Sequence, residues 1–215
     1  MSEYRLPNEQ MLKREFEKLK EDVHLSLFLD SKEDDNSFSI FEFMSHITSL
    51  DARIKLRVIT KKTKPELFEK YKITEVPTIV IEGSGIRYVS IPAGPEASVF
   101  IQTLVMKSTA NSGIGEAICK ILSILTKKVH LKTIVTSQCT ICPLAVRIGN
   151  MLSLESALKG NNKIQHEIVD ASEHADYVSQ FDVSAVPIIL INDRVIFNGI
   201  PDVDKYVHEI FEAGK

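Results

Sequence analysis

Two parts of this sequence resemble each other closely enough to indicate a tandem duplication. Residues 71–81 read YKITEVPTIVI and residues 181–191 read FDVSAVPIILI, so a Val-Pro pair recurs from position 77 to position 187. Upstream, Val-His-Leu opens an apolar segment at position 23 and again at position 129. Two matches in the same order, at nearly the same offset, predict that one fold is present twice.

The segments around these landmarks predict the same order of elements in each half. In the first half, apolar periodicity predicts helices over 8–20, 38–50, 65–70 and 96–107, and strands over 23–29, 54–59, 78–81 and 86–91. In the second half the helices are predicted over 115–125, 143–158, 173–181 and 201–211, and the strands over 129–137, 164–169, 188–191 and 195–197. The predicted fold class is α/β, with a central mixed sheet flanked by helices in each half. A short polar segment, 108–113, separates domains predicted at 1–110 and 111–215.

Charge and hydropathy narrow the function classes. The net charge is −3 and both signs are mixed along the chain, which favours neither nucleic acid nor a membrane surface as a partner. No apolar stretch approaches the roughly 20 residues that span a bilayer, and residues 1–22 are too charged for a signal peptide. We therefore expect a cytoplasmic protein. Three cysteines are too few for a disulfide scaffold.

The chemistry is expected at Cys139 and Cys142, which form a C-x-x-C motif between a predicted strand and a helix that begins at Pro143. The start of a helix presents unpaired N–H groups and a partial positive charge, which favour a thiolate. Cys139 is nearer the loop and is expected to be the exposed nucleophile. Cys142 lies about one helical turn further on and can close a disulfide with it.

Two other interpretations of this motif are possible. A C-x-x-C pair can supply half of a zinc or iron–sulfur site, but such sites need four ligands, and the remaining cysteine, Cys119, lies on another predicted helix. The pair can also be a structural disulfide without turnover. We favour redox chemistry without a metal, because C-x-x-C near a βαβ pattern is typical of redox motifs. Cys119 itself is interpreted as a small packed residue, with a second reactive thiol as the alternative.

With C-x-x-C-P at 139–143 and Val186-Pro187 before a strand, the sequence resembles the thioredoxin superfamily. Its two-half layout resembles the archaeal and thermophilic protein disulfide oxidoreductases, also called glutaredoxin-like proteins. It is similar as well to the N-terminal domain of the flavoprotein subunit of alkyl hydroperoxide reductase. The resemblance implies two thioredoxin-like folds in tandem. It also implies a cis Pro187 beside the dithiol and a Val186 backbone that pairs with an incoming peptide.

The first half departs from the disulfide oxidoreductase pattern because it has no C-x-x-C motif. An offset of 106 residues places Glu33 where the second half has Cys139, and Asn36 where it has Cys142. A disulfide needs two sulfur atoms. The first half is therefore predicted to be a thioredoxin-like domain without redox chemistry, as in the peroxide-reductase relative.

The group that accepts a proton from Cys142 also differs from the family pattern. Many thioredoxins have a buried Asp six residues before the nucleophile, where this chain has Thr133. The two-half relatives place an acid just before a Phe in the last helix of the first half, whereas here Glu96 lies one turn earlier. Glu96 is our candidate acceptor, with Glu167 and Asp170 as further candidates. Each of the three is otherwise interpreted as a solvated surface carboxylate.

The resemblance implies an electron relay. A protein thiol–disulfide oxidoreductase of this kind passes electrons to disulfide-containing proteins or to a peroxiredoxin, and is reduced by an NAD(P)H-dependent flavoprotein reductase. The chain has no GxGxxG sequence, so we expect it to bind no dinucleotide cofactor itself. Two alternatives stay open: a glutathione-dependent glutaredoxin, and a redox-inactive binding or chaperone module that uses the clefts beside Pro77 or Pro187.

Overall fold

The structure is a computed structural model that describes residues 8–30, 35–181 and 183–215, with the side chains of residues 35 and 36 excepted. In the first half the elements are, in order, α1 (Glu9–Phe16), β1 (Val23–Leu29), α2 (Asp35–Leu50), β2 (Ile54–Thr60), α3 (Pro65–Tyr71), β3 (Thr78–Ile81), β4 (Ile86–Val89) and α4 (Pro95–Ser108). In the second half they are α5 (Glu116–Ser123), β5 (Val129–Val135), α6 (Cys142–Leu158), β6 (Ile164–Asp170), α7 (Ala175–Val178), β7 (Ile188–Ile191), β8 (Arg194–Asn198) and α8 (Val203–Gly214). Of the described helices, none is long and apolar enough to cross a membrane.

The duplication is visible in the strands. β1 and β5 have the same length and the same burial pattern, in which only the second residue is exposed. Each of these strands pairs in parallel with the next strand of its own half and antiparallel with the one after that. The four residues by which the second half is longer fall between β5 and β6, mostly in α6 and the turn that follows it.

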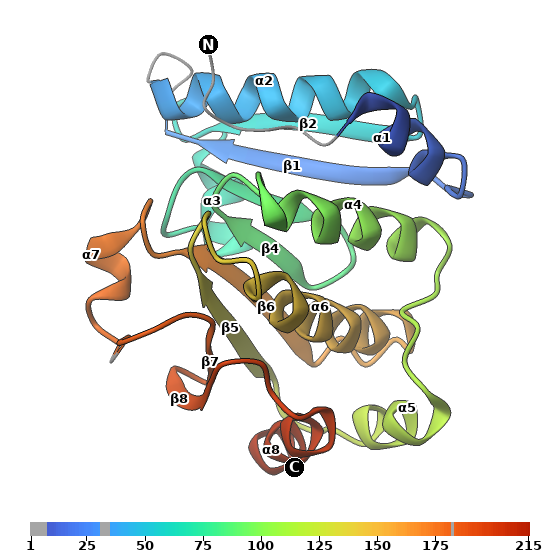
Figure 1. Cartoon of the computed structure of the whole chain (residues 1–215), viewed down its shortest axis with the longest axis vertical. Helices are drawn as coiled ribbons and strands as arrows, with labels where there is room; N and C mark the ends of the chain where they lie inside the picture. The colour runs from blue at the N-terminus through green and yellow to red at the C-terminus, as the bar shows by residue number, and fades with distance from the viewer. Residues whose placement is uncertain (1–7, 31–34, 182) are drawn as a thin grey trace.

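The two halves share one sheet. The order of the eight described strands is β2-β1-β3-β4-β6-β5-β7-β8, so the last strand of the first half pairs in parallel with β6 of the second (Figure 1). The predicted fold class, a tandem pair of mixed sheets flanked by helices, is therefore confirmed. The sheets are fused edge to edge.

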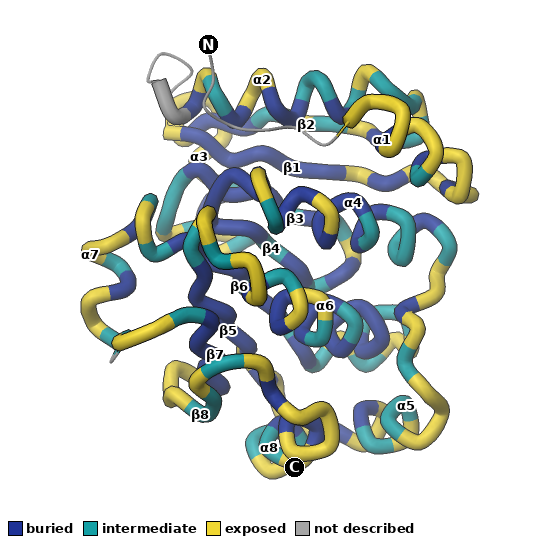
Figure 2. The backbone as a smooth tube through the Cα atoms, viewed as in Figure 1, coloured by how far each residue is buried: buried dark blue, intermediate teal, exposed yellow. Residues whose placement is uncertain are grey.

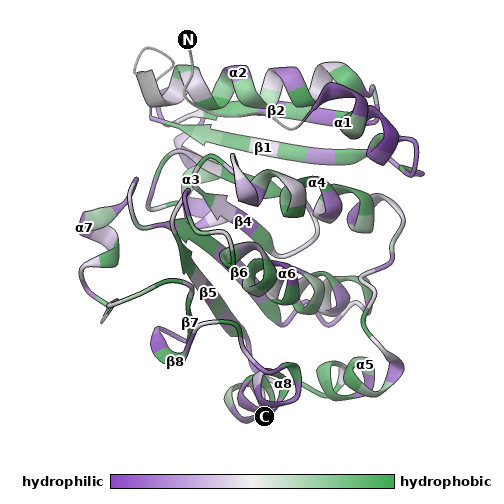
Figure 3. Cartoon of the chain, viewed as in Figure 1, coloured by the Kyte–Doolittle hydropathy of each residue, from purple (hydrophilic) through white to green (hydrophobic). Residues whose placement is uncertain are grey.

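Helices cover the two faces of this sheet unequally. α4 and α6 pack against each other in front of the sheet in Figure 1. On the other face, α3 packs on β1 and β2 through Phe68, and α7 packs on β5 and β6 through Val178. Buried residues concentrate in the strands and on the inner sides of α4 and α6 (Figure 2), which are also the hydrophobic parts of the chain (Figure 3). The helix expected over 173–181 is shorter than predicted, with α7 limited to Ala175–Val178.

A buried hydrogen-bond network joins the two halves where α4 and α6 pack on the sheet. The Asn150 amide donates to the Tyr88 hydroxyl at 2.8 Å and to the Thr103 hydroxyl at 2.9 Å, both in the first half. Its carbonyl lies 2.8 Å from Nδ1 of His166, whose Nε2 lies 2.8 Å from the Thr133 hydroxyl. Burial lowers the pKa of His166 to about 3, so the ring is neutral and its Nδ1–H donates to Asn150.

Gly149 permits this arrangement. A Cβ atom at Gly149 would lie 2.4 Å from Cε1 of His166, closer than any side chain tolerates. The imidazole therefore rests directly on the backbone of α6. The position that many thioredoxins give to a buried Asp is occupied here by Thr133, which serves this network.

We predict that Asn150→Ala destabilises the protein by about 3 kcal/mol, because it takes a hydrogen-bond partner away from three buried polar groups. Urea denaturation monitored by circular dichroism measures the difference. Asn198→Ala, at an exposed position in β8, is the control and should change stability little. Equal stability of the two variants would show that the network contributes nothing to joining the halves.

Candidate active site

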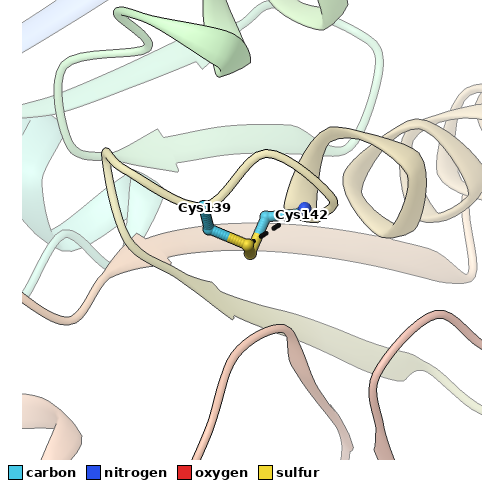
Figure 4. The surroundings of a disulfide bond; sticks show 2 residues. All are labelled: Cys139 and Cys142. Atoms are coloured by element: carbon cyan, nitrogen blue, oxygen red, sulfur yellow. Dashed lines mark hydrogen bonds between the residues drawn. A yellow bond between two sulfur atoms is a disulfide. The ribbon is translucent and has the colours of Figure 1, made fainter.

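The dithiol lies where the end of β5 meets the start of α6. Cys139 and Cys142 are joined by a disulfide, with their Cα atoms 5.5 Å apart (Figure 4). Cys142 is the first residue of α6 and is completely buried, whereas Cys139 is partly exposed. The backbone N–H of Cys142 donates to Sγ of Cys139 at 3.1 Å, the dashed line in Figure 4. Of the two cysteine residues, Cys139 is therefore the one accessible from outside.

Pro187 reaches this edge of the sheet from β7. Its peptide bond with Val186 is cis, as the resemblance implies, and so is the equivalent Val76–Pro77 bond in the first half. β7 begins one residue later, at Ile188, which pairs with Ile134 near the end of β5. Pro187 is buried and Val186 is half-buried. Val186 and Cys139 both pack against the core cluster that contains Cys142.

The first half also contributes to the site, through the start of α4. The carbonyl oxygen of Ser137, in the dithiol loop, lies 3.3 Å from the position that a Cβ atom would occupy at Gly94, the N-cap of α4. Gly94 has a φ of +58°, so a side chain is disfavoured there on both counts. Val99 and Phe100 of α4 lie in the same core cluster as Cys142. The close contact at Gly94 thus seats α4 against the dithiol loop.

Glu96 lies on the first turn of α4 and is buried, with 5% of its surface exposed. Neither carboxylate oxygen has a hydrogen-bond partner within the described residues. Burial, and then the charge of Asp170, raise the pKa of Glu96 to about 8. The interpretation of Glu96 as a solvated surface carboxylate is therefore wrong, because α4 packs its first turn inward.

Two more carboxylates lie at the same end of the sheet. Asp170 ends β6, directly opposite Val135 at the end of β5, and is buried, so its interpretation as a solvated carboxylate is wrong as well. Glu173 is half-buried, and its pKa is raised to about 7 by burial and by the charge of Asp170. Sequence reasoning missed Glu173. Its position just after a parallel strand that neighbours the dithiol strand could have indicated it.

The remaining candidates lie elsewhere. Glu167 is half-buried on β6 and contacts Lys132 at 3.6 Å and Arg87 at 3.9 Å, on the face away from α6. Glu33 lies outside the described residues, and Asn36 is described only by its backbone at the start of α2.

Cys119 is half-buried on α5 and is not part of the dithiol site. Its Sγ donates to the Glu155 carboxylate at 3.0 Å. Burial and this bond raise the pKa of the Cys119 thiol, which disfavours the reactive thiolate. The prediction of a packed residue is correct in part only, since the side chain is incompletely covered and hydrogen-bonded.

Comparison with known proteins identifies the fold. Residues 129–212 match the thioredoxin domain family. No curated protein matches the sequence. Among solved structures, a protein disulfide oxidoreductase from Aeropyrum pernix is similar at 25% identity and a TM-score of 0.92, over 99% of this chain and 97% of that one. AhpF, a component of the alkylhydroperoxide reductase of Enterococcus faecalis, is similar at 25% identity and a TM-score of 0.84, over 94% and 96%. The NTD_N/C domain of AhpF from the same organism is similar at 24% identity and a TM-score of 0.84, over 96% and 100%.

We predict that Glu96→Gln stabilises the oxidised protein, increasingly so as the pH rises. The pKa of Glu96 is about 8 in the folded protein and exceeds the ordinary value of 4.5, so as the pH rises the unfolded chain releases this proton before the folded protein does. The free energy of unfolding of the wild type therefore falls as the pH rises from 4.5 to 8. At pH 7 the variant should be more stable by about 3 kcal/mol, and near pH 4.5 by almost nothing. Urea denaturation across this pH range measures the difference.

Glu69→Gln, at an exposed position, is the control and should show no such trend. A stability difference between Glu96→Gln and wild type that stays constant with pH would contradict a raised pKa at Glu96.

Proposed function

We propose that this chain, which contains a thioredoxin domain with a Cys139–Cys142 disulfide, is a protein thiol–disulfide oxidoreductase. The observation that carries this proposal is the asymmetry of the pair, since Cys139 is partly exposed and Cys142 is fully buried at the start of α6. That asymmetry suits a nucleophile that meets the partner and a second thiol that completes the reaction.

In the reduced protein, the Cys139 thiolate attacks one sulfur of a partner disulfide, and that S–S bond breaks. The released partner sulfur takes up a proton, and a mixed disulfide remains on Cys139. Cys142 then loses its proton and attacks Sγ of Cys139, which releases the second partner thiol and closes the internal disulfide. Two electrons pass from the chain to the partner. The N–H of Cys142, which points at Sγ of Cys139, stabilises the thiolate in the first step.

Glu96 is the proposed proton carrier for Cys142. Its carboxyl has a pKa of about 8 and no hydrogen-bond partner among the described groups, so at neutral pH it holds a proton in the disulfide form. When the disulfide is reduced, this proton can pass to the leaving Cys142 thiolate, and it returns to Glu96 before Cys142 attacks. A pKa near the working pH suits transfer in both directions.

Partner docking is proposed beside Pro187. The backbone of Val186 would pair with an extended segment of the partner, as a strand does at a sheet edge. Ile141 and Leu144 flank Cys142 and are about half exposed, at 47% and 53%. Apolar side chains exposed around a reactive sulfur favour a polypeptide partner over a small polar one.

The similar structures support a relay role. One of them belongs to an alkylhydroperoxide reductase. We propose that this chain takes electrons from an NAD(P)H-dependent flavoprotein reductase and passes them to protein disulfides or to a peroxiredoxin, in the cytoplasm. The first half, residues 1–110, would act without a dithiol of its own by holding α4 and Glu96 against the site.

We predict that Cys139→Ser abolishes insulin reduction, because no exposed sulfur remains at the site. Cys142→Ser should instead retain the nucleophile and accumulate mixed disulfides with partners, which non-reducing electrophoresis and mass spectrometry detect. In the reduced wild type, alkylation at mildly acidic pH should label Cys139 before Cys142. Faster labelling of Cys142 would reverse the two roles.

Cys119→Ala is the matched control and should reduce insulin at the wild-type rate, because Cys119 lies on α5 outside the dithiol site. A folded Cys119→Ala variant with greatly reduced turnover would show a third redox thiol. Turnover that depends on glutathione instead of a flavoprotein reductase would favour the glutaredoxin alternative.

A further inference from the structure

The sheet face away from α4 and α6 is covered only in part. α3 and α7 pack on the apolar residues near the carboxyl ends of the strands, such as Phe28, Val169 and Ile134. Side chains alternate along a strand, so the same face carries polar residues toward the strand starts, including His130 on β5 and Gln165 on β6. This uncovered half of the face is a polar surface that crosses the junction of the two halves.

A cavity of about 250 Å³ opens in this surface. It lies between the end of α3, the β3–β4 turn and the starts of β5 and β6. Four cationic side chains line it: Lys70, Lys72 and Arg87 from the first half, and Lys128 from the second. Neither half forms this cavity without the other.

The positive charge in the cavity is not neutralised. Lys70, Lys72 and Lys128 make no ion pair with any described residue. Arg87 donates to the Lys72 carbonyl oxygen at 3.2 Å, and its contact with a carboxylate is long, 3.9 Å from Glu167. The Lys70 ammonium lies over the Tyr71 ring, 5.8 Å from its centroid, which leaves its charge without an anionic partner. All three ammonium groups can therefore meet an anion.

The acidic residue in the lining, Glu82, is already occupied. Its carboxylate accepts hydrogen bonds from the Tyr71 hydroxyl at 2.8 Å and the Ser26 hydroxyl at 2.5 Å, and it contacts Arg57 at 3.2 Å. Glu82 therefore offsets Arg57, which lies outside the cavity, and does not pair with the three lysines that line it.

Neutral donors complete the lining. Asn162 and Gln165 also line the cavity, and their side-chain amides make no hydrogen bond with another described residue. His130 also lines the cavity, and its pKa is lowered by partial burial and by the charges of Arg87, Lys72 and Lys128, against an opposing contribution from Asp193. Arg87, Lys72 and Lys128 therefore all lie close enough to His130 to act on its charge.

We propose that this cavity binds the phosphate group of a small phosphorylated molecule. A phosphate dianion carries two negative charges and several acceptor oxygens, which match unpaired ammonium groups, a guanidinium and free amide donors. A single carboxylate would leave most of this charge unopposed. The cavity lies at the start of β5 and the dithiol follows its end, about 20 Å away for a seven-residue strand. The ligand is therefore not a substrate of the dithiol.

Calorimetric titration of the whole oxidised protein at low, constant chloride tests the proposal, with inorganic phosphate, ribose 5-phosphate and ribose as probes. We expect the two phosphates to bind saturably, one per chain, and ribose not to bind. The double variant Lys72→Gln/Lys128→Gln should weaken phosphate binding by roughly tenfold or more.

Lys61→Gln/Lys62→Gln is the matched control, since it removes the same charge from exposed lysines beyond the end of β2. It should leave phosphate binding within about twofold of wild type. Both double variants should reduce insulin normally, so a failure here is separate from a failure of the redox proposal. The proposal is overturned if wild type shows no saturable phosphate binding, or if both variants weaken it equally. Tighter binding of a short single-stranded oligonucleotide through Lys72 and Lys128 would overturn the small-molecule assignment.

Discussion

The parallel pairing of β4 with β6 is the constraint on which the rest of the molecule depends. It turns two duplicated units into one continuous sheet. It also sets α4 beside α6, and that contact buries Asn150 against Tyr88 and Thr103. Because buried polar groups are costly unless all are paired, the network fixes one relative position of the halves. A chain cut between the halves would expose both strand edges and these polar groups together.

This fixed position is what makes the dithiol site a product of both halves. Cys139, Cys142 and Pro187 come from the second half, but the helix that carries Glu96 comes from the first. In a single thioredoxin-like unit, the acid and the dithiol would belong to one fold. Here the sequence separates them by more than forty residues, and α4 brings the carboxylate to the carboxyl end of the sheet. The first half, which contains no cysteine, therefore still contributes a helix that packs against the dithiol loop.

Much of this architecture is predictable from residue patterns. The strands β1, β3 and β7 have the predicted boundaries, because each is a short, mostly apolar run that begins and ends beside polar or proline residues. The C-x-x-C disulfide and the cis Pro187 follow from the motif and the resemblance. Sequence patterns do not predict the features that depend on contacts between segments far apart in the chain. The burial of Glu96 requires knowing that α4 faces the dithiol loop, and the role of Asn150 requires knowing that β4 and α4 lie beside α6.

The two halves are related by a translation across the strands of the sheet, so the strand at one edge of each half differs from the strand at its other edge. A translation does not generate a closed ring, so this geometry alone would let further chains add to the edges of the sheet without limit. At the internal junction, Arg87 of β4 lies opposite Glu167 of β6. The position on the outer strand β2 that corresponds to Glu167 is Arg57, and the β8 position that corresponds to Arg87 is Val195. The complementary charges that join the units inside one chain are thus missing from its two outer edges, which discourages fibre-like growth from chain to chain.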